Sequence, residues 1–214
     1  MVWGIETGGY RVNDDLMKAL ADEELSSPHA SNLGGLIGRP LADEAGIPAF
    51  IYDAVTGASL PEVAKVTGFP EIVKQSCCHV LNSRAMAIKY AKENGLDYRK
   101  INIVVVHMGG GISMSAHRQG EIVDSIGDDE GQFSPERSGC VQLLEFLKLC
   151  YSGKYTYAEM KKKCRGKGGM AAYLGTSDAR EIEKMIDGGD EKAKLLYDGE
   201  AYQVAKGIGQ MSAV

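Results

Sequence analysis

The sequence predicts an α/β protein built from mixed sheets with flanking helices. Short runs of apolar and β-branched residues have the composition of strands at residues 49–52 and 101–106, and residues 112–116 alternate apolar with polar side chains as a strand does. Longer segments carry apolar residues at helical spacing, most clearly at residues 71–94 and 143–149. With 214 residues, of which 44% are hydrophobic, the chain can bury a substantial core.

The N-terminal part is predicted to contain two helices followed by a strand. Residues 14–24 have the pattern of a short helix, and residues 36–45 have a weaker helical pattern. The apolar run at 49–52 is predicted to be a buried strand that ends at Asp53. An acid at the end of a strand is placed to face a cleft.

The remainder begins with one long helix over about residues 71–94, which Gly95 ends. Three strands separated by tight turns follow, and the chain after Pro135 is mainly helical. The expected later elements are strands at 101–106, 112–116 and 121–124 and helices at 143–149, 157–164, 179–186 and from 191 to the end.

Charge and hydropathy exclude some classes of function. The net charge is -5 and the pI is about 5.5, which gives no basic stripe for nucleic acid or an anionic membrane. No apolar run approaches the roughly 20 residues that span a bilayer, and the first residues do not resemble a signal sequence. We therefore expect a cytoplasmic protein that binds neither nucleic acid nor membrane.

The most informative motif is His-Met-Gly-Gly-Gly-Ile-Ser at residues 107–113. His107 is predicted at the end of a strand, and the three glycines, Gly109, Gly110 and Gly111, are predicted to form the sharp turn that follows. In a P-loop or a dinucleotide fold the phosphate lies at the N-terminus of a helix. Here the next element is a strand, so a phosphate would be held by the amides of the turn instead. The alternative is an ordinary glycine-rich hairpin with a solvent-facing histidine.

A second motif, Phe-Ser-Pro-Glu-Arg-Ser-Gly at residues 133–139, follows in an irregular segment that begins at Asp128. This segment combines acids, an arginine and turn residues that a core does not need. Loops of this composition commonly carry function.

Together the two motifs closely resemble butyrate kinases, which are relatives of acetate kinase in the actin and sugar-kinase superfamily. The triple glycine and the Glu136-Arg137 pair favour the butyrate branch. The resemblance extends over essentially the whole chain, through residues 8–13, 29–35, 46–53 and 172–180.

The resemblance implies a partial actin-like ATPase (ribonuclease H-like) fold with two lobes. Residues 1–77 would be the remnant of an N-terminal substrate lobe, and residues 78–214 would be a truncated nucleotide lobe. It also implies the reversible reaction of butyrate and ATP to butyryl phosphate and ADP, with Mg²⁺ as metal ion and a homo-oligomer, a dimer or larger, as the assembly.

Site residues follow from the same resemblance. His107 and Arg137 would contact the transferred phosphoryl group, and Asp53 would hold Mg²⁺. The nucleotide and its phosphates would be bound by the turn glycines, Ser113, Asp178 and Arg180, and the cleft would be lined by His29 and Asn32. Some of these roles have a structural alternative, namely an ion pair within its own loop for Arg137, a turn acid for Asp53 and a helix cap for Asp178.

The resemblance covers the central part of such an enzyme, without the first strands or the adenosine-binding segment of the family. We therefore expect this polypeptide by itself to bind ATP weakly and to turn over little substrate. Two alternatives remain open: a kinase for branched-chain or other short-chain acids, including acetate, and a non-catalytic gene fragment.

Overall fold

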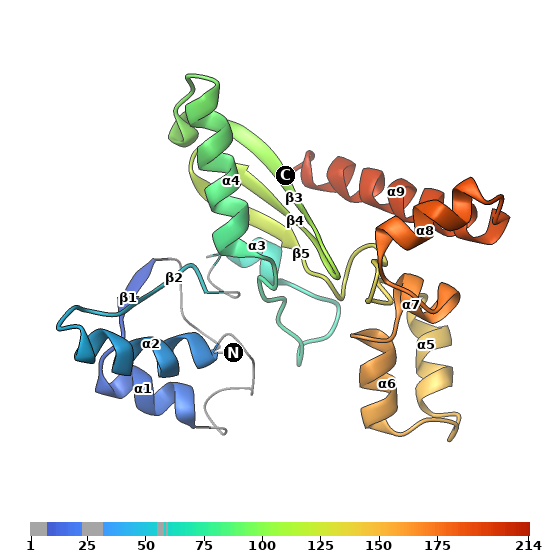
Figure 1. Cartoon of the computed structure of the whole chain (residues 1–214), viewed down its shortest axis with the longest axis horizontal. Coiled ribbons are helices and arrows are strands. Elements are labelled where there is room, and N and C mark those ends of the chain that lie inside the picture. The colour runs from blue at the N-terminus through green and yellow to red at the C-terminus, as the bar shows by residue number, and fades with distance from the viewer. Residues whose placement is uncertain (1–7, 23–31, 55–57, 59) are drawn as a thin grey trace. The chain divides into compact units, whose positions relative to one another are not determined.

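A computed structural model describes residues 8–22, 32–54, 58 and 60–214. The described residues form an α/β structure that divides into two compact units (Figure 1). Unit 1 comprises residues 1–103 and 117–124, and unit 2 comprises residues 104–116 and 125–214. Each unit is described by itself below.

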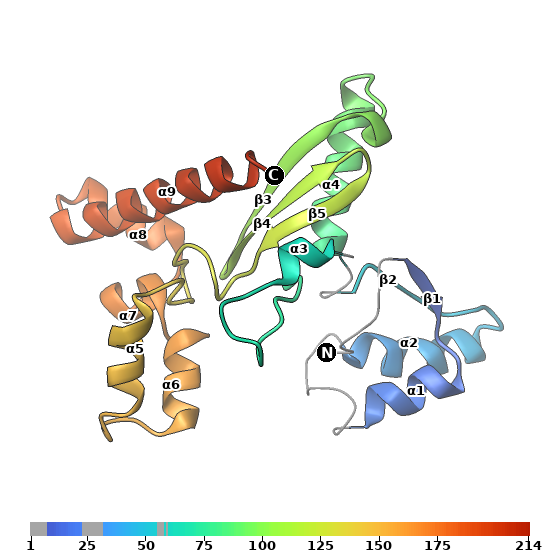
Figure 2. The same ribbon diagram turned by 180° about the vertical axis from the view of Figure 1, so that it is seen from behind.

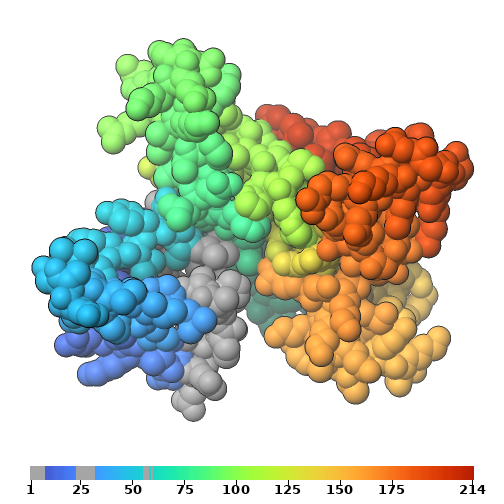
Figure 3. Space-filling model, in the orientation of Figure 1, coloured from blue at the N-terminus to red at the C-terminus, as the bar shows by residue number. Residues whose placement is uncertain are grey.

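The elements before the second sheet all belong to unit 1. They are β1 (Gly9–Arg11), α1 (Asp14–Ala21), α2 (Asn32–Glu44), β2 (Phe50–Tyr52), α3 (Glu62–Lys65), α4 (Val80–Glu93) and the 3₁₀ turn η1 (Tyr98–Lys100). β1 and β2 pair antiparallel, with Tyr10 opposite Ile51. α1 and α2 pack against one another (Figure 3, blue). At their contact Gly35 lies so close to Leu20 that a Cβ atom there would be 2.5 Å from Leu20 Cδ1.

The second sheet has the strand order β3-β4-β5, with β3 at Asn102–Met108, β4 at Ile112–Arg118 and β5 at Glu121–Ile126. One end of this sheet belongs to unit 1 and the remainder to unit 2. Residues 112–117 of β4 are all buried, so this central strand is covered on both faces. In unit 1 the covering element is α4, whose Ser83 hydroxyl lies 2.8 Å from His117 Nε2.

Unit 2 continues with five helices after the sheet, namely α5 (Leu143–Cys150), α6 (Tyr157–Cys164), α7 (Gly169–Leu174), α8 (Ala179–Asp187) and α9 (Glu191–Met211). α5 and α6 lie side by side in both Figure 1 and Figure 2. α7, α8 and α9 share a core of Met170, Ile182 and Ala193. α9 also packs on β4, because Gly207 leaves room for the thioether of Met114. No helix among the described residues is long and apolar enough to cross a membrane.

Several expected elements differ from the structure. The helix predicted over residues 71–94 begins only at Val80. The segment before it makes other backbone contacts: the amide of Lys74 donates to the carbonyl of Lys65, and the Thr67 hydroxyl donates to the carbonyl of Ile72. The predicted helix at 191 to the end stops at Met211, with Ser212 as its cap.

The strand at 49–52 is present but is not buried as predicted. Phe50 and Tyr52 are exposed, whereas Ile51 is partly buried and faces Gly35 of α2. Among the described residues, helices therefore cover one face of the β1–β2 pair. An apolar run of this length does not distinguish a strand covered on one face from a strand covered on both.

Candidate active site

The triple glycine forms the turn between β3 and β4, as predicted. The amide of Gly109 donates to the carbonyl of Gly111 at 3.1 Å. His107, at the end of β3, has its ring against this turn, because a Cβ atom at Gly109 would lie 3.4 Å from His107 Nε2. Ser113 is buried in β4.

The arginine-bearing loop is hydrogen-bonded directly to this turn within unit 2. The carbonyl of Gly110 accepts from the Glu136 amide at 2.9 Å and from the Ser134 hydroxyl at 2.8 Å. A side chain at Gly110 would crowd the Glu136 carboxylate, at 3.1 Å from Oε2. The two motifs that carry the resemblance are therefore in contact in the folded chain.

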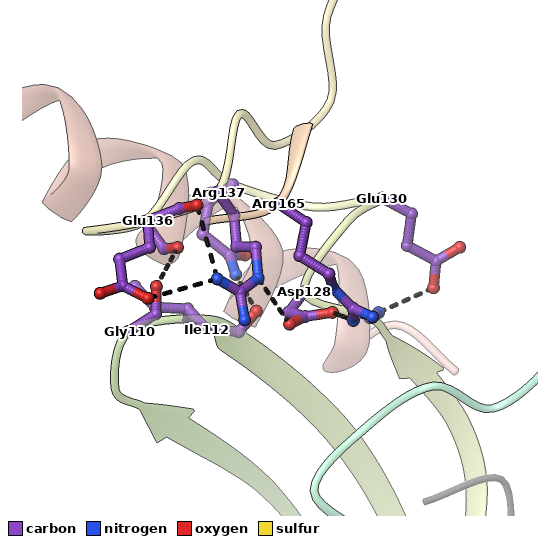
Figure 4. Close-up of polar contacts among 10 residues, drawn as sticks. Gly110, Ile112, Asp128, Glu130, Glu136, Arg137 and Arg165 are labelled. Carbon is purple, nitrogen blue, oxygen red and sulfur yellow. Dashed lines mark hydrogen bonds and ion pairs between the residues drawn. The ribbon is translucent and has the colours of Figure 1, made fainter. Parts of the chain in front are cut away.

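Arg137 is held by acids of its own loop (Figure 4). Its Nε donates to Asp128 Oδ2 at 3.0 Å, and its Nη1 donates to the carbonyl of Glu136 at 3.4 Å and lies 3.6 Å from Glu136 Oε2. The Arg137 side chain is 18% exposed and that of Asp128 is 7% exposed. The ion pair that was the structural alternative for Arg137 is thus present, and it is a partly buried pair at the glycine turn.

A second arginine reaches the same carboxylate from the end of α6. Arg165 Nη2 donates to Asp128 Oδ1, and the backbones of Arg137 and Arg165 form an antiparallel bridge. Flanking hydrogen bonds join Ser138 N to Cys164 O at 3.1 Å and Gly166 N to Glu136 O at 2.8 Å. The loop is therefore fixed to this segment by its backbone as well as by charge.

The start of α7 closes the loop from its other side. Amides of Met170 and Ala171 donate to the carbonyls of Ser134 and Pro135 at 3.2 Å and 2.9 Å. Gly169 makes this approach possible, since its φ is +60° and a Cβ atom there would lie 1.7 Å from the carbonyl oxygen of Ser134. A glycine at position 169 is thus a requirement of the loop's anchoring.

The predicted pair Asp178 and Arg180 lies at the start of α8, where Ser177 donates to Glu136 Oε1 at 3.2 Å. Asp178 caps the helix by accepting from the Arg180 amide at 2.9 Å, and it also pairs with the Arg180 side chain. Hydrogen bonds from the Arg180 side chain and amide lower the pKa of Asp178 to about 2. The capping alternative is therefore present in the structure, and Arg180 is largely exposed.

Asp53 belongs to unit 1, where it follows β2 with a φ of +42°. Its Oδ2 accepts from Arg84 Nε at 3.0 Å, and among the described residues its Oδ1 has no hydrogen-bond partner. Mg²⁺ needs few protein carboxylates because it retains water and binds substrate phosphates. One unengaged carboxylate oxygen fits that requirement, although no cluster of three or more His, Cys, Asp or Glu suited to a metal occurs among the described residues.

Of the two cleft-lining residues, Asn32 is buried at the first position of α2, in unit 1. This helix starts four residues before the predicted position of Leu36. His29 lies outside the described residues.

Unit 1 also contains a buried polar cluster around His117. Its Nδ1 lies 2.8 Å from the Tyr98 hydroxyl, and its Nε2 contacts Ser83. Burial, with the nearby Arg84 guanidinium, lowers the pKa of His117 to about 4. Beside this cluster is a hollow of about 660 Å³, and none of its lining residues is a predicted site residue.

Several residues of the candidate site were missed by reasoning from the sequence. Asp128 and Glu136 stood in the segment singled out as functional, but nothing in the sequence specified that their carboxylates bind Arg137. Arg165 lies in a basic stretch from Lys161 to Lys167, and such a stretch predicts only a solvated face. Its pairing with Asp128 follows from the backbone bridge, which has no local sequence signal.

Solved kinases have the same fold as this chain. Acetate kinase from Porphyromonas gingivalis superposes with a TM-score of 0.82 at 24% identity, covering 97% of this chain and 55% of that one. A propionate kinase from Francisella tularensis subsp. tularensis SCHU S4 gives a TM-score of 0.81 at 22% identity, covering 97% of this chain and 56% of that one. The predicted fold class is confirmed.

Residues 73–214 match the Acetokinase family, and the chain belongs to that family. It is 47% identical over 211 residues to "Probable butyrate kinase 2" of Caldanaerobacter subterraneus subsp. tengcongensis, covering 98% of this chain and 59% of the relative. It is 44% identical over 209 residues to "Butyrate kinase 2" of Clostridium acetobutylicum, covering 97% of this chain and 58% of that protein. The predicted resemblance to butyrate kinases is confirmed, and the chain spans about 59% of the length of these relatives.

Proposed function

We propose that this chain supplies the phosphoryl-transfer site of a carboxylate kinase that converts butyrate and ATP to butyryl phosphate and ADP, reversibly. The observation that carries the proposal is the direct bonding of the Arg137 loop to the triple-glycine turn, through Gly110. The butyrate kinases that resemble this chain support the choice of butyrate.

In phosphoryl transfer the protein mainly positions the reactants and neutralises the charge on the transferred phosphoryl group. In the proposed mechanism a carboxylate oxygen of the acid attacks the γ-phosphorus of ATP in line, and the bond to the β–γ bridging oxygen breaks. His107 donates a hydrogen bond to a γ-phosphoryl oxygen, and Arg137 binds the same group or the acid's carboxylate. Turn amides at residues 109–111 hold phosphate oxygens.

Asp53 would hold Mg²⁺ through Oδ1 or a water molecule, and bound Mg²⁺ would neutralise phosphate charge. In this proposal Asp178 and Arg180 approach the nucleotide, Ser113 supports the phosphate turn, and Asn32 and His29 line the cleft. The same proposal includes a lobe boundary near residue 77 and assembly as a homo-oligomer. It also includes a cytoplasmic location, where ATP is present.

Nucleotide binding by the purified 214-residue chain tests the site directly. Titration with MgATP in a calorimeter should give weak binding that His107→Ala reduces, while Lys148→Met, an exposed change on α5, leaves it unaltered. Equal affinities for His107→Ala and the unaltered chain would contradict the proposed site.

Trapping acyl phosphate as hydroxamate measures turnover of the same preparation. We expect little or no product with butyrate, because the chain spans about 59% of its relatives' length. Turnover typical of a complete kinase would refute this expectation of low activity. If product forms, relative kcat/KM for acetate, propionate, butyrate and isobutyrate identifies the preferred acid.

A further inference from the structure

Asp128 connects the parts of the candidate site through one buried carboxylate. The residue is 5% exposed, and its two oxygens bind different arginines, Oδ2 to Arg137 and Oδ1 to Arg165. We propose that Asp128 is the positioning residue of Arg137, which it holds in the orientation that receives the phosphoryl group. This inference rests on the proposed function and adds a residue to which no role in it has been assigned.

The pattern of contacts around Arg137 determines which edge of its guanidinium remains for a ligand. Asp128 binds Nε, and Glu136 binds Nη1 through its carbonyl and its carboxylate. Among the described residues none makes a hydrogen bond or ion pair with Nη2. Because a guanidinium is planar, fixing Nε and Nη1 also fixes the direction in which Nη2 donates.

Arg165 fixes the orientation of the Asp128 carboxylate, and we call this carboxylate with its two arginines the clamp. A buried carboxylate that binds one cation can still rotate about its Cβ–Cγ bond, whereas one with a different arginine on each oxygen cannot rotate without breaking an ion pair. The backbone bridge between Arg137 and Arg165 keeps the two arginines at a constant separation. Arg165 also compensates the charge of Asp128, so that binding of Arg137 to an anion does not leave the buried carboxylate unpaired.

Gly111 couples the clamp to the phosphate turn. A Cβ atom at position 111 would lie 2.7 Å from Asp128 Oδ2 and 3.0 Å from Asp128 Cβ. The carboxylate therefore lies directly against the turn whose amides are proposed to bind phosphate. The same oxygen, Oδ2, faces both the turn and Arg137, so a displacement of Asp128 changes both.

A purely structural ion pair predicts a different result from a positioning residue. Loss of a structural pair lowers stability and frees Arg137 Nε from Asp128, but leaves the nucleotide affinity of the folded protein unchanged. Loss of a positioning residue frees the Arg137 side chain and weakens nucleotide binding in protein that remains folded.

Arginine side-chain NMR shows whether Asp128 holds Arg137, without requiring turnover, and the nucleotide affinity then separates the two cases. The Nε–H signal of Arg137, assigned by its absence in Arg137→Lys, should exchange with solvent about tenfold faster in Asp128→Asn than in the unaltered chain, because a charge-assisted hydrogen bond is lost. Arg165→Met should accelerate the exchange about threefold, since Asp128 then regains one rotation. It also serves as the second variant should Asp128→Asn not fold.

The matched control is Asp124→Asn in unit 1. Asp124 is also a partly buried carboxylate, with 17% of its side chain exposed, and it pairs with Lys74 at 2.8 Å. This change removes an ion pair of similar burial and should leave the Arg137 signal and the MgATP affinity unaltered.

Calorimetry with MgATP completes the test. Asp128→Asn should weaken binding about tenfold, comparable to the loss of one charge-assisted contact, and Arg165→Met should weaken it less. Unchanged Arg137 exchange in both variants overturns the proposal, and so does faster exchange with unchanged MgATP affinity. If the unaltered chain binds no MgATP, the proposed function fails, and the exchange measurement then decides by itself whether Asp128 holds Arg137.

Discussion

Two arginine–aspartate pairs of the molecule have nearly the same geometry and very different surroundings. Arg137 binds Asp128 and Arg84 binds Asp53, each from Nε to Oδ2 at 3.0 Å, with Arg side chains 18% and 16% exposed. Arg84 also donates to the carbonyl of Gly120, and its Nη2 is buried without a hydrogen-bond partner among the described residues. Among the described residues, Nη2 of Arg137 is not one of the buried atoms without a hydrogen-bond partner, and Arg137 stands in a loop that is bonded to the glycine turn.

The comparison indicates that the ion pair does not by itself distinguish a structural arginine from one that can bind a ligand. What distinguishes the two pairs is whether the aspartate has a second cation besides its arginine partner. Asp128 has a second cation in Arg165, so Arg137 can bind an anion while Asp128 stays compensated. Among the described residues Asp53 pairs with Arg84 and with no other cation, so Arg84 is expected to matter mainly for stability, while the Mg²⁺ role proposed for Asp53 uses its other oxygen, Oδ1.

The largest effect is expected for Arg84→Met. It leaves the Asp53 carboxylate, 12% exposed, without its cation, and removing one partner of a buried pair costs about 3 kcal/mol. Urea unfolding at pH 7 measures this loss. Lys148→Met, which breaks an exposed pair with Glu145, should change the free energy of unfolding by less than about 0.5 kcal/mol. Equal effects of the two changes would contradict the structural role of Arg84.

The second effect concerns His117, which lies in the buried polar cluster of unit 1 close to Arg84. Its pKa is lowered to about 4, below the ordinary value of 6.5, so it contributes stability above pH 6.5 that is lost as the pH falls towards 4. The loss should amount to about 3 kcal/mol over this window. His117→Gln lacks the titrating ring, and its free energy of unfolding should fall less over the same window. Parallel pH profiles for the two proteins would show that the ring does not titrate on unfolding.

Arg137→Met should produce the contrasting result for the other pair. Because Asp128 keeps Arg165, the free energy of unfolding should fall by only about 1 kcal/mol, whereas MgATP affinity should fall about tenfold. Thermal unfolding and calorimetry on one preparation measure both quantities. A stability loss as large as that of Arg84→Met, with unchanged nucleotide affinity, would remove the distinction between the two pairs.

The smallest effect is expected for Glu200 of α9, in unit 2. Burial raises its pKa to about 7, and its Oε2 is buried without a partner among the described residues. Its neutral form is compatible with the fold, so stability is greatest below about pH 4.5 and falls as the pH rises to about 7, opposite in sign to His117. Glu200→Gln should raise the melting temperature at pH 8 and leave it unchanged at pH 4.5. A rise of the same size at both values would exclude ionisation as the cause.

Local patterns predicted most of the elements but not all of their boundaries. The helices α5, α6 and α8 and the three strands of the second sheet lie where periodicity and turn residues indicated. The short helix α7 and the strand β1 were missed, because six and three residues carry too little periodicity to be recognised. The start of α4 was missed because backbone groups of Ile72 and Lys74 bond to residues 65–69 in place of a helical ladder.

For the site, the sequence specified the two motifs and their order, and the family resemblance supplied the roles proposed for His107 and Arg137. Those properties are local, since a glycine turn and an arginine loop are defined by neighbouring residues. The tertiary structure decided that Asp128 binds Arg137 and that Arg165 shares its carboxylate. It also decided that both Ser113 and His117, which are polar residues of β4, are buried. Ion pairs and burial depend on which distant segments the backbone brings together, and charge and hydrophobic pattern do not identify the partner.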